Sequence, residues 1–283
     1  MQTLNARETG GLFWATADPS EILPTVTSFG VRCAQIGLRG DLDPGVGPVW
    51  NKALRQANLV ITSVCAAYNG EDYADIPTVQ RTVGFIPRAT RAEREERTRR
   101  VSDFAAAVGA GGIATHIGVV PHDHQNPDYL DVRDLVRRIC DHAASHNQTF
   151  ALETGQETAP VLLDFIRDVD RSNLGINFDP ANMILYGTGD PIDALGLLAK
   201  HVFSVHCKDG DWPPKGDPSA LGREQPLGSG AVGIPRFLKK LVDIGYRGPL
   251  TIEREGVNRS QWEQDVRNAI RLLESLKANA APA

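Results

Sequence analysis

Four apolar segments in the second half of the chain each end in a residue that can bind a metal ion or transfer a proton. These residues are Glu153, Asp179, His206 and Glu253. Three carboxylates and one imidazole that meet in one place are unfavourable unless a cation lies between them. An oxygen-rich set with one histidine suits Mn²⁺, Mg²⁺ or Co²⁺, and Zn²⁺ is a further candidate. The four residues therefore predict one divalent metal site, if the fold brings the segments together.

Each of these residues taken alone has a simpler explanation. A carboxylate at the end of a strand often caps the following helix or pairs with a cation on the surface. Four such residues at the ends of four successive apolar segments favour a shared site over four separate structural roles.

The pattern of the whole chain provides a fold that joins these segments. Apolar runs alternate with helical patterns, and strict alternation of this kind indicates parallel strands with right-handed crossovers. Eight units in 283 residues match an α/β fold of the single-domain (β/α)8 TIM-barrel type, which needs about 250 residues. An open doubly wound sheet is disfavoured, because no glycine-rich phosphate loop follows the first run. The expected strands are residues 12–16, 32–38, 59–68, 113–119, 149–154, 174–179, 202–208 and 249–253.

The domain is expected to span residues 1–283, with two long connections at about 69–90 and 209–232. Both follow the carboxyl end of a strand, so they should lie on the face of the barrel that holds active sites. Long loops of this kind are usually lids or binding loops. Residues 278–283 at the end of the chain are expected to be frayed.

Several other residues are candidates for substrate contacts. Lys208 follows His206 by two positions, so both side chains should point to the same side of their strand. His116 ends the fourth strand, although a hydrogen-bonded structural role would explain it equally well. The remaining candidates are Trp14 at the end of the first strand, Gln35 inside the second, and Arg223 in the connection 209–232.

Residues 149–255 resemble the xylose-isomerase-like TIM barrels, the sugar (phosphate) isomerase/epimerase family. The resemblance implies one divalent metal ion, often Mn²⁺, held by Glu153, Asp179, His206 and Glu253. In the ketose 3-epimerases of this group the first and last glutamates also act as acid and base, a role that would fall to Glu153 and Glu253. The matching pieces are residues 151–153, 177–182, 204–209, 227–230 and 245–253.

This resemblance implies a reaction through a metal-stabilised enediolate. A metal that chelates a carbonyl and a neighbouring hydroxyl makes the adjacent C–H acidic. Two carboxylates on opposite sides of the sugar would then invert a stereocentre, and a single base would give aldose–ketose isomerisation. Loss of a β-hydroxyl would instead give a lyase or dehydratase acting on a keto-sugar or keto-inositol. Many of the epimerases carry a substrate-binding histidine where this chain has Asn182, whose amide can also hydrogen-bond a substrate hydroxyl. Because the residue differs, the resemblance does not identify the substrate.

The net charge and the few histidines at strand ends limit the classes of ligand that the protein is expected to bind. The net charge of −5 disfavours nucleic-acid binding, which relies on basic groups. A zinc-dependent repair endonuclease on the same barrel would require many more histidines at strand ends. The retention of both Glu153 and Glu253 argues against a sugar- or metal-binding protein that has lost its activity. The expected ligand is a small sugar or keto-polyol.

The location of the protein is inferred from what the sequence lacks. No apolar stretch approaches the roughly 18 residues of a membrane span, and residues 1–10 have no apolar signal core. The four cysteines are far apart, as is typical of free thiols in a reducing compartment. We therefore expect a cytoplasmic protein that does not bind membranes. The family resemblance suggests a homo-oligomer.

Overall fold

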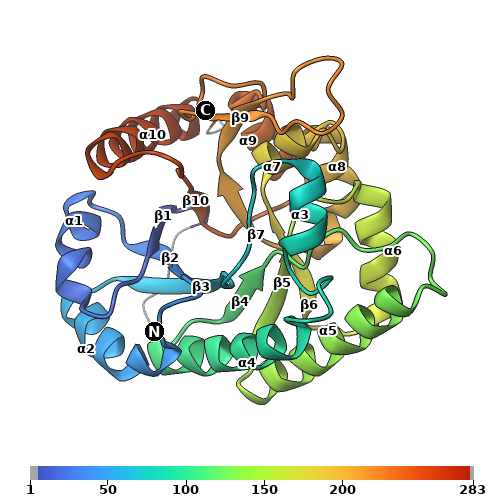
Figure 1. Cartoon of the computed structure of the whole chain (residues 1–283). Coiled ribbons are helices and arrows are strands. Elements are labelled where there is room, and N and C mark those ends of the chain that lie inside the picture. The colour runs from blue at the N-terminus through green and yellow to red at the C-terminus, as the bar shows by residue number, and fades with distance from the viewer. Residues whose placement is uncertain (1–5, 281–283) are drawn as a thin grey trace.

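Eight parallel strands form a closed barrel in the computed structural model, which describes residues 6–280 (Figure 1). Each barrel strand pairs with the barrel strand before it in the sequence, and the first pairs with the last to close the ring. The predicted single (β/α)8 barrel is confirmed. Its strands are β1 (Thr9–Trp14), β2 (Cys33–Leu38), β3 (Val60–Ala66), β4 (Gly112–Thr115), β5 (Thr149–Glu153), β6 (Leu174–Phe178), β7 (Val202–Cys207) and β10 (Leu250–Ile252).

Helices surround the barrel (Figure 1). Within residues 6–280 no helix is long and apolar enough to cross a membrane. The helices are α1 (Leu23–Ser28), α2 (Gly47–Ala57), α3 (Ile76–Thr82), α4 (Arg91–Val108), α5 (Pro127–Ser145), α6 (Ala159–Val169), α7 (Pro180–Tyr186), α8 (Pro191–Leu198), α9 (Ile234–Asp243) and α10 (Arg259–Ala280), with short 3-10 turns at Pro19–Glu21, Pro44–Val46 and Ala199–His201.

The outer and inner faces of the barrel strands carry different side chains. Large apolar side chains such as Ile36, Phe150 and Phe178 belong to the main core, in which strands and helices pack together. Inside the barrel a separate small cluster contains Leu12, Cys65, Ala114 and Ala151. Because strand side chains alternate between faces, the residues two positions further along, such as Glu153 after Ala151, also point inward. These small interior residues leave room for polar groups at the carboxyl ends of the strands.

One glycine has a clear role in this interior. A Cβ at Gly37 would lie 2.4 Å from the indole ring of Trp14. Since real Cβ contacts are never so short, only glycine lets the Trp14 ring occupy this space beside β2. The indole is thereby placed at the carboxyl end of β1.

Some expected boundaries are wrong. The fourth strand was expected over residues 113–119, but β4 ends at Thr115. Beyond it the carbonyl of Ile117 accepts a hydrogen bond from the backbone N–H of Phe85, so this segment pairs with a loop and not with a strand. Helix α7 was not expected. It begins directly after β6, where the side chain of Asp179 caps its first turn.

The two long connections contain secondary structure of their own. The segment 69–90 includes α3, and the segment 209–232 includes an antiparallel hairpin of β8 (Asp209–Asp211) and β9 (Arg223–Gln225). The buried carboxylate of Asp209 holds the second connection together. It accepts four backbone hydrogen bonds, from Gly210 at 3.0 Å, Gly228 at 2.9 Å, Gly230 at 3.0 Å and Val232 at 3.1 Å.

The last helix includes part of the tail that was expected to be frayed. Helix α10 extends to Ala280, and residues 281–283 lie outside the described residues, so the fraying of this tail stays a prediction. The helix is anchored by buried Val266 and Leu273 and by hydrogen bonds from Thr9 to Glu274 and from Lys277 to Thr9. This packing and bonding offset the entropy that favours fraying.

Candidate metal centre and substrate cavity

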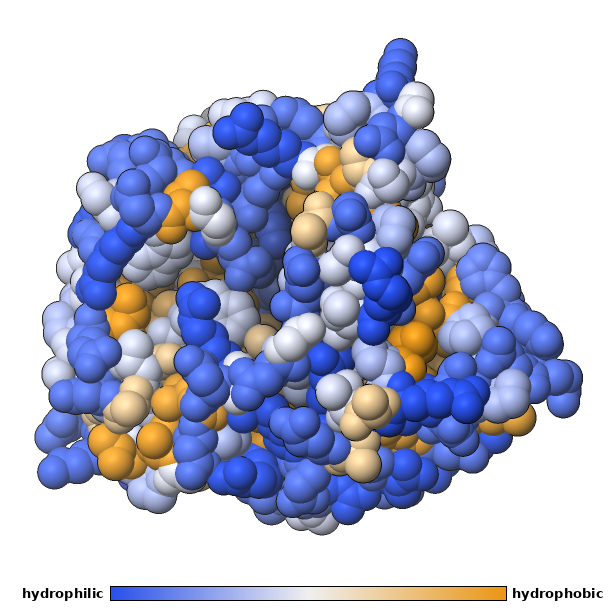
Figure 2. Space-filling model, in the orientation of Figure 1, coloured by the Kyte–Doolittle hydropathy of each residue, from blue (hydrophilic) through white to orange (hydrophobic). Residues whose placement is uncertain are grey.

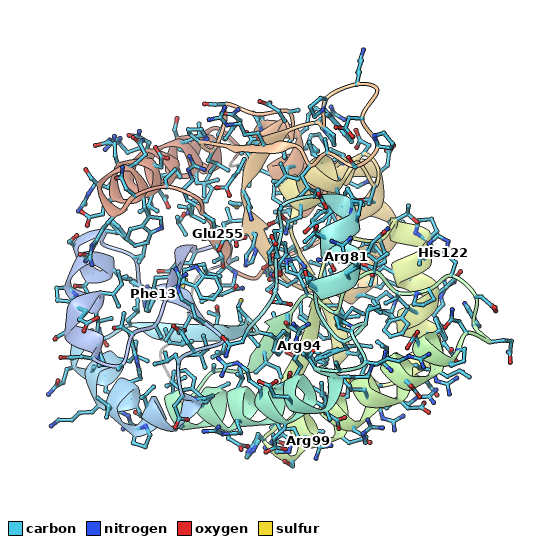
Figure 3. The ribbon with its side chains drawn as sticks, in the orientation of Figure 1. Phe13, Arg81, Arg94, Arg99, His122 and Glu255 are labelled. Atoms are coloured by element: carbon cyan, nitrogen blue, oxygen red, sulfur yellow. The ribbon has the colours of Figure 1, made fainter. Side chains whose placement is uncertain are left out.

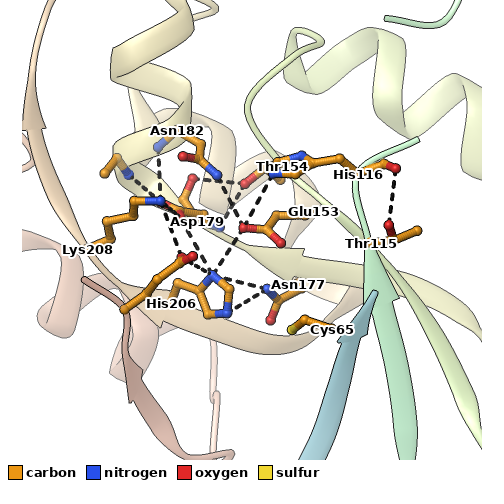
Figure 4. Close-up of polar contacts among 12 residues, drawn as sticks. Cys65, Thr115, His116, Glu153, Thr154, Asn177, Asp179, Asn182, His206 and Lys208 are labelled. Atoms are coloured by element: carbon orange, nitrogen blue, oxygen red, sulfur yellow. Dashed lines mark hydrogen bonds and ion pairs between the residues drawn. The ribbon is translucent and has the colours of Figure 1, made fainter. Parts of the chain in front are cut away.

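Glu153, Asp179, His206 and Glu253 converge at the carboxyl ends of four neighbouring barrel strands (Figure 4). One ligand atom from each lies within 4.8 Å of the others. The Nδ1 atom of His206 is 3.2 Å from Glu153 Oε1, 3.6 Å from Asp179 Oδ2 and 2.6 Å from Glu253 Oε2. The residues that the sequence singled out therefore share one centre.

Asp179 shows how a helix cap can also serve a metal centre. Its Oδ1 atom accepts hydrogen bonds from the backbone N–H groups of Ala181 at 2.8 Å and Asn182 at 3.0 Å, at the start of α7. Its Oδ2 atom is buried, and within residues 6–280 it has no hydrogen-bond partner. The cap fixes the carboxylate so that the second oxygen is free to face the centre. The cap predicted for such a residue is present at Oδ1, and Oδ2 is placed where a metal ligand would be.

Glu253 presents a second buried oxygen without a hydrogen bond. Oε2 lies 2.6 Å from His206 Nδ1 and 3.5 Å from the Lys208 ammonium, but neither contact has hydrogen-bond geometry, and no other residue in the range 6–280 donates to it. A buried carboxylate oxygen without a donor is costly. Two such oxygens aimed at one imidazole nitrogen fit a cation bound between them.

Two amide side chains inside the barrel hold the imidazole of His206 in its orientation. Its Nε2 atom lies 2.8 Å from the amide oxygen of Gln35 and 3.0 Å from Nδ2 of Asn177. In the neutral imidazole, donation from Nε2 to Gln35 leaves a lone pair on Nδ1, which faces the three carboxylates. Ligating histidines usually have such a partner on the other ring nitrogen. Gln35 therefore supports His206 and does not line the substrate cavity.

The charges of the side chains around the centre favour a bound cation. Burial alone would raise the pKa of Glu153, Asp179 and Glu253, but neighbouring cations lower the pKa of each, with His116 and His206 acting on Glu153. Burial would lower the pKa of Lys208, yet Glu253 and Asp179 raise it well above its usual value. Binding of a metal ion at Nδ1 requires neutral His206, and three carboxylates and one ammonium then leave two net negative charges. One divalent cation would neutralise them.

A cavity of about 590 Å³ opens above this centre, and Figure 2 shows the hollow on the face of the molecule. Such a volume is typical of small-molecule sites. The residues predicted from the sequence that line it are Trp14, His116, Glu153, Asn182, Lys208 and Glu253.

Lys208, Asn182 and His116 surround the candidate ligands. The ammonium of Lys208 is 3.5 Å from Glu253 Oε2 and 3.7 Å from Asp179 Oδ2. Asn182 donates to Glu153 Oε1 at 3.2 Å, and His116 Nε2 is 3.8 Å from the same oxygen. Each can thus contact both a candidate ligand and a molecule in the cavity.

Arg223 does not belong to this group. It is exposed on β9 and is not among the residues that line the cavity, whereas its neighbour Glu224 is. Side chains alternate between the two faces of a strand, so adjacent residues on β9 point in opposite directions. The structure therefore does not place Arg223 at this cavity, where a substrate contact was expected.

Sequence reasoning missed several residues of the cavity. Glu255 follows Glu253 by two positions, the same spacing that singled out Lys208, and it accepts a hydrogen bond from Trp14 Nε1 at 3.2 Å. Burial, reinforced by Glu253, raises its pKa to about 7. Others come from the connections, where no strand pattern pointed to them. These are Glu71, Tyr73, Tyr186 and Glu224.

The model of the family described as "Xylose isomerase-like TIM barrel" matches residues 27–276. The chain belongs to the xylose isomerase-like TIM barrel family. A solved structure of a xylose isomerase domain protein from Planctomyces limnophilus is 41% identical, with a TM-score of 0.92 over 97% of this chain and 98% of the other.

Two solved structures of lower sequence identity share the fold. A D-tagatose 3-epimerase-like protein is 18% identical, with a TM-score of 0.73 over 96% of this chain and 97% of the other. The probable 3-DHS dehydratase AsbF of Bacillus anthracis is 19% identical, with a TM-score of 0.66 over 94% and 98% of the two chains.

Among curated proteins, the Rhizopine catabolism protein MocC of Rhizobium meliloti is 30% identical over 140 residues, which is 43% of this chain and 40% of the relative. The match thus spans less than half of that relative's length.

Proposed function

We propose that the protein is a divalent-metal-dependent isomerase or epimerase of a sugar or keto-polyol. The observation that supports this most directly is the placement of Glu153 and Glu253. They extend from β5 and from the end of β10, which are separated in the barrel by β6 and β7, and both reach Nδ1 of His206. Two carboxylates that approach one centre from different walls suit proton transfer to and from two faces of a bound sugar.

The metal ion would be held by Glu153, Asp179, His206 and Glu253. Mn²⁺ is the favoured ion, because the set is rich in oxygen and contains one imidazole. When bound, it would polarise a carbonyl and the neighbouring hydroxyl of the substrate and so acidify the adjacent C–H.

The chain's own groups would then divide the work. One of Glu153 and Glu253 removes the proton next to the carbonyl, and the other returns a proton from the opposite side. The Lys208 ammonium, 3.5 Å from Glu253 Oε2, stabilises negative charge on the substrate oxygens. Asn182 and His116 hydrogen-bond hydroxyl groups, and the Trp14 ring packs against the apolar face of the sugar.

A lyase or dehydratase is the second candidate, supported by an additional carboxyl group in the cavity. Glu255 Oε2 lies 3.7 Å from Lys208 Nζ, so an acid and an ammonium stand together beside the two glutamates. In this alternative they would assist the departure of a β-hydroxyl. The AsbF dehydratase has the same fold.

Solvent deuterium labelling tests the proposal and separates the two candidates. The metal-loaded protein would be incubated in D₂O with D-fructose, D-tagatose, D-psicose, L-ribulose and a keto-inositol. Deuterium at the carbon next to the carbonyl in a product without loss of water indicates an epimerase or isomerase. A product that has lost water indicates the dehydratase.

Matched variants assign the proton transfer. Glu153→Gln and Glu253→Gln are expected to lower the exchange rate by about 100-fold or more, the usual contribution of a general acid or base. Glu93→Gln on the exposed face of α4 is the control and should exchange at the wild-type rate. Metal content is measured for each variant. Exchange at the wild-type rate in both cavity variants would refute the assigned roles.

A further inference from the structure

A second cavity of about 710 Å³ adjoins the first on the same face of the barrel. It lies where the connections after β1, β2 and β10 meet, and Figure 3 shows Phe13 and Glu255 in this part of the barrel, between α1 and α10. None of the four candidate metal ligands lines it. It is therefore distinct from the site at which the proposed reaction takes place.

The two cavities share one wall. The residues that line both are Leu12, Trp14, Arg39, Asp41 and Glu255. Trp14 is held between two of them, since its Nε1 donates to Glu255 at 3.2 Å and the Arg39 guanidinium lies 4.9 Å from the centre of its ring. A molecule that crosses from one cavity to the other therefore passes beside the Trp14 indole.

The walls found only in the second cavity are largely apolar. They include Phe13, Ile22, Leu42, Val257 and Trp262. Trp262 is half-buried and packs edge-on against Phe29, with ring centres 5.4 Å apart, so its orientation is defined. Aromatic walls of this kind bind flat rings and the apolar C–H faces of sugars.

The cations at the edge of the second cavity differ in their bonding. Arg259 is engaged by Glu263 and by the carbonyl of Glu21. The guanidinium of Arg39 has no hydrogen bond or ion pair with any residue in the range 6–280 and is held only by the Trp14 ring. It remains available for an oxygen atom of a molecule lying across the shared wall.

We propose that the substrate is a glycoside, with its reacting keto-sugar ring beside Glu153 and Glu253 and a second ring in the second cavity, beside Trp262. The linkage between the rings would lie over Trp14, within reach of Arg39. This inference rests on the proposed function and adds the class of substrate. A single sugar ring would leave the apolar second cavity without a ligand.

Binding of simple glycosides tests the second cavity. Calorimetry with the Mn²⁺-loaded protein compares phenyl β-D-glucoside with methyl β-D-glucoside, which differ only in the second ring. We expect the phenyl compound to bind about tenfold more tightly, which is about 1.4 kcal/mol, because the phenyl ring gains an aromatic contact and buries apolar area in the second cavity. Equal binding of the two compounds would overturn the proposal.

Variants locate the preference. Trp262→Ala removes an aromatic wall and should reduce the phenyl preference to about twofold or less. Val257→Trp fills the cavity without removing a packed side chain, so it should do the same even if Trp262→Ala folds poorly. Trp212→Ala is the matched control, since Trp212 is exposed and lines neither cavity. A preference that persists in Val257→Trp would place the phenyl ring elsewhere and refute the inference.

The labelling experiment distinguishes this inference from the proposed function. If free keto-sugars exchange deuterium but the phenyl preference is absent, only the second cavity is misassigned. If the preference is present but neither the free keto-sugars nor a glycoside of a keto-sugar, added to the same labelling experiment, exchanges deuterium, the proposed reaction is wrong and the second cavity remains a binding site.

Discussion

Two groups of histidine and carboxylate side chains in residues 6–280 have a spacing that could hold a metal ion, and only one of them has the surroundings of a metal site. The inner group consists of Glu153, Asp179, His206 and Glu253 inside the barrel. The outer group consists of Asp103 on α4, His142 on α5 and His146, which directly follows the end of α5. The distances alone do not separate them.

The difference lies in how each group is satisfied without a metal ion. In the outer group, Nε2 of His142 and Nε2 of His146 each lie 2.9 Å from the same oxygen of Asp103, and the Asp103 side chain is 56% exposed. Water and these hydrogen bonds satisfy it. In the inner group, Asp179 and Glu253 each have a buried oxygen that makes no hydrogen bond with any described residue, and Lys208 is the single ammonium beside three carboxylates. Unsatisfied buried charge, and not convergence, therefore identifies the candidate metal centre.

The largest expected effect is loss of metal from the inner group. Asp179→Asn and Asp179→Ala should each reduce bound Mn²⁺ from about one ion per chain to none, as measured by mass spectrometry of the purified protein. Asparagine keeps an acceptor for the start of α7, whereas alanine also removes the helix cap and should cost about 1 kcal/mol more in unfolding free energy. Retention of the ion in Asp179→Asn would show that the inner group does not hold it.

A smaller effect is expected from the support beneath His206. Gln35→Leu leaves Nε2 without its acceptor and should weaken Mn²⁺ binding by about 10- to 100-fold, as is typical when the partner of a ligating histidine is lost. Competition with a chelator measures the affinity. Gln125→Leu, at an exposed position in the loop before α5, is the control. Unchanged affinity in Gln35→Leu would mean that Gln35 does not orient the ligand.

The pH dependence of metal affinity also distinguishes the inner group. In the metal-free protein, burial opposes protonation of His206, but Glu253 and Glu153 raise its pKa well above the usual 6.5. Protonated His206 stabilises the fold below pH 6.5, and this contribution is lost as the pH rises through the folded-state pKa. Binding at Nδ1 must displace this proton. Metal affinity should rise about tenfold per pH unit above 6.5, up to the raised pKa.

Calorimetry in buffers of different ionisation enthalpy would check this pH effect by measuring the protons released on metal binding. About one proton per Mn²⁺ is expected near neutral pH. Release of no proton would indicate that His206 is neutral before the metal binds.

The smallest effect is expected in the outer group. Asp103→Ala should leave the metal content unchanged and alter the unfolding free energy by less than about 1 kcal/mol, because exposed ion pairs contribute little. Thermal unfolding and metal analysis of this variant would check both values. Loss of one bound ion would contradict the distinction between the two groups.

Much of the candidate centre could be predicted because a barrel translates strand order into position. Glu153, Asp179, His206 and Glu253 each end an apolar run, and successive strands of a closed barrel are neighbours. The period of two also placed Lys208 on the side of His206. The same spacing of two also places Glu255 on the side of Glu253, where it lines the cavity.

Other parts of the site depend on structure that the strand pattern does not show. Arg223 was expected to reach the substrate, but the hairpin of β8 and β9 was unforeseen, and its alternation turns Glu224 inward instead. Tyr73 precedes α3, in a connection without a regular pattern. The alternation of β2 places the Gln35 side chain inside the barrel. Its contact with Nε2 of His206 is visible only in the structure, because the sequence does not show how far below the cavity the side chain lies.

The four backbone hydrogen bonds accepted by Asp209 allow the loop at the cavity to change in sequence and length with little effect on the free energy of folding of the barrel. They join both ends of the segment 209–232 at one carboxylate, so the residues between these ends form a loop that is closed at its base. Lengthening such a segment costs little free energy, since closure entropy grows slowly with loop length. Relatives of this protein could thus acquire new substrates through changes in this loop. Chimeric proteins could be built by exchanging the loop at the two ends that Asp209 joins.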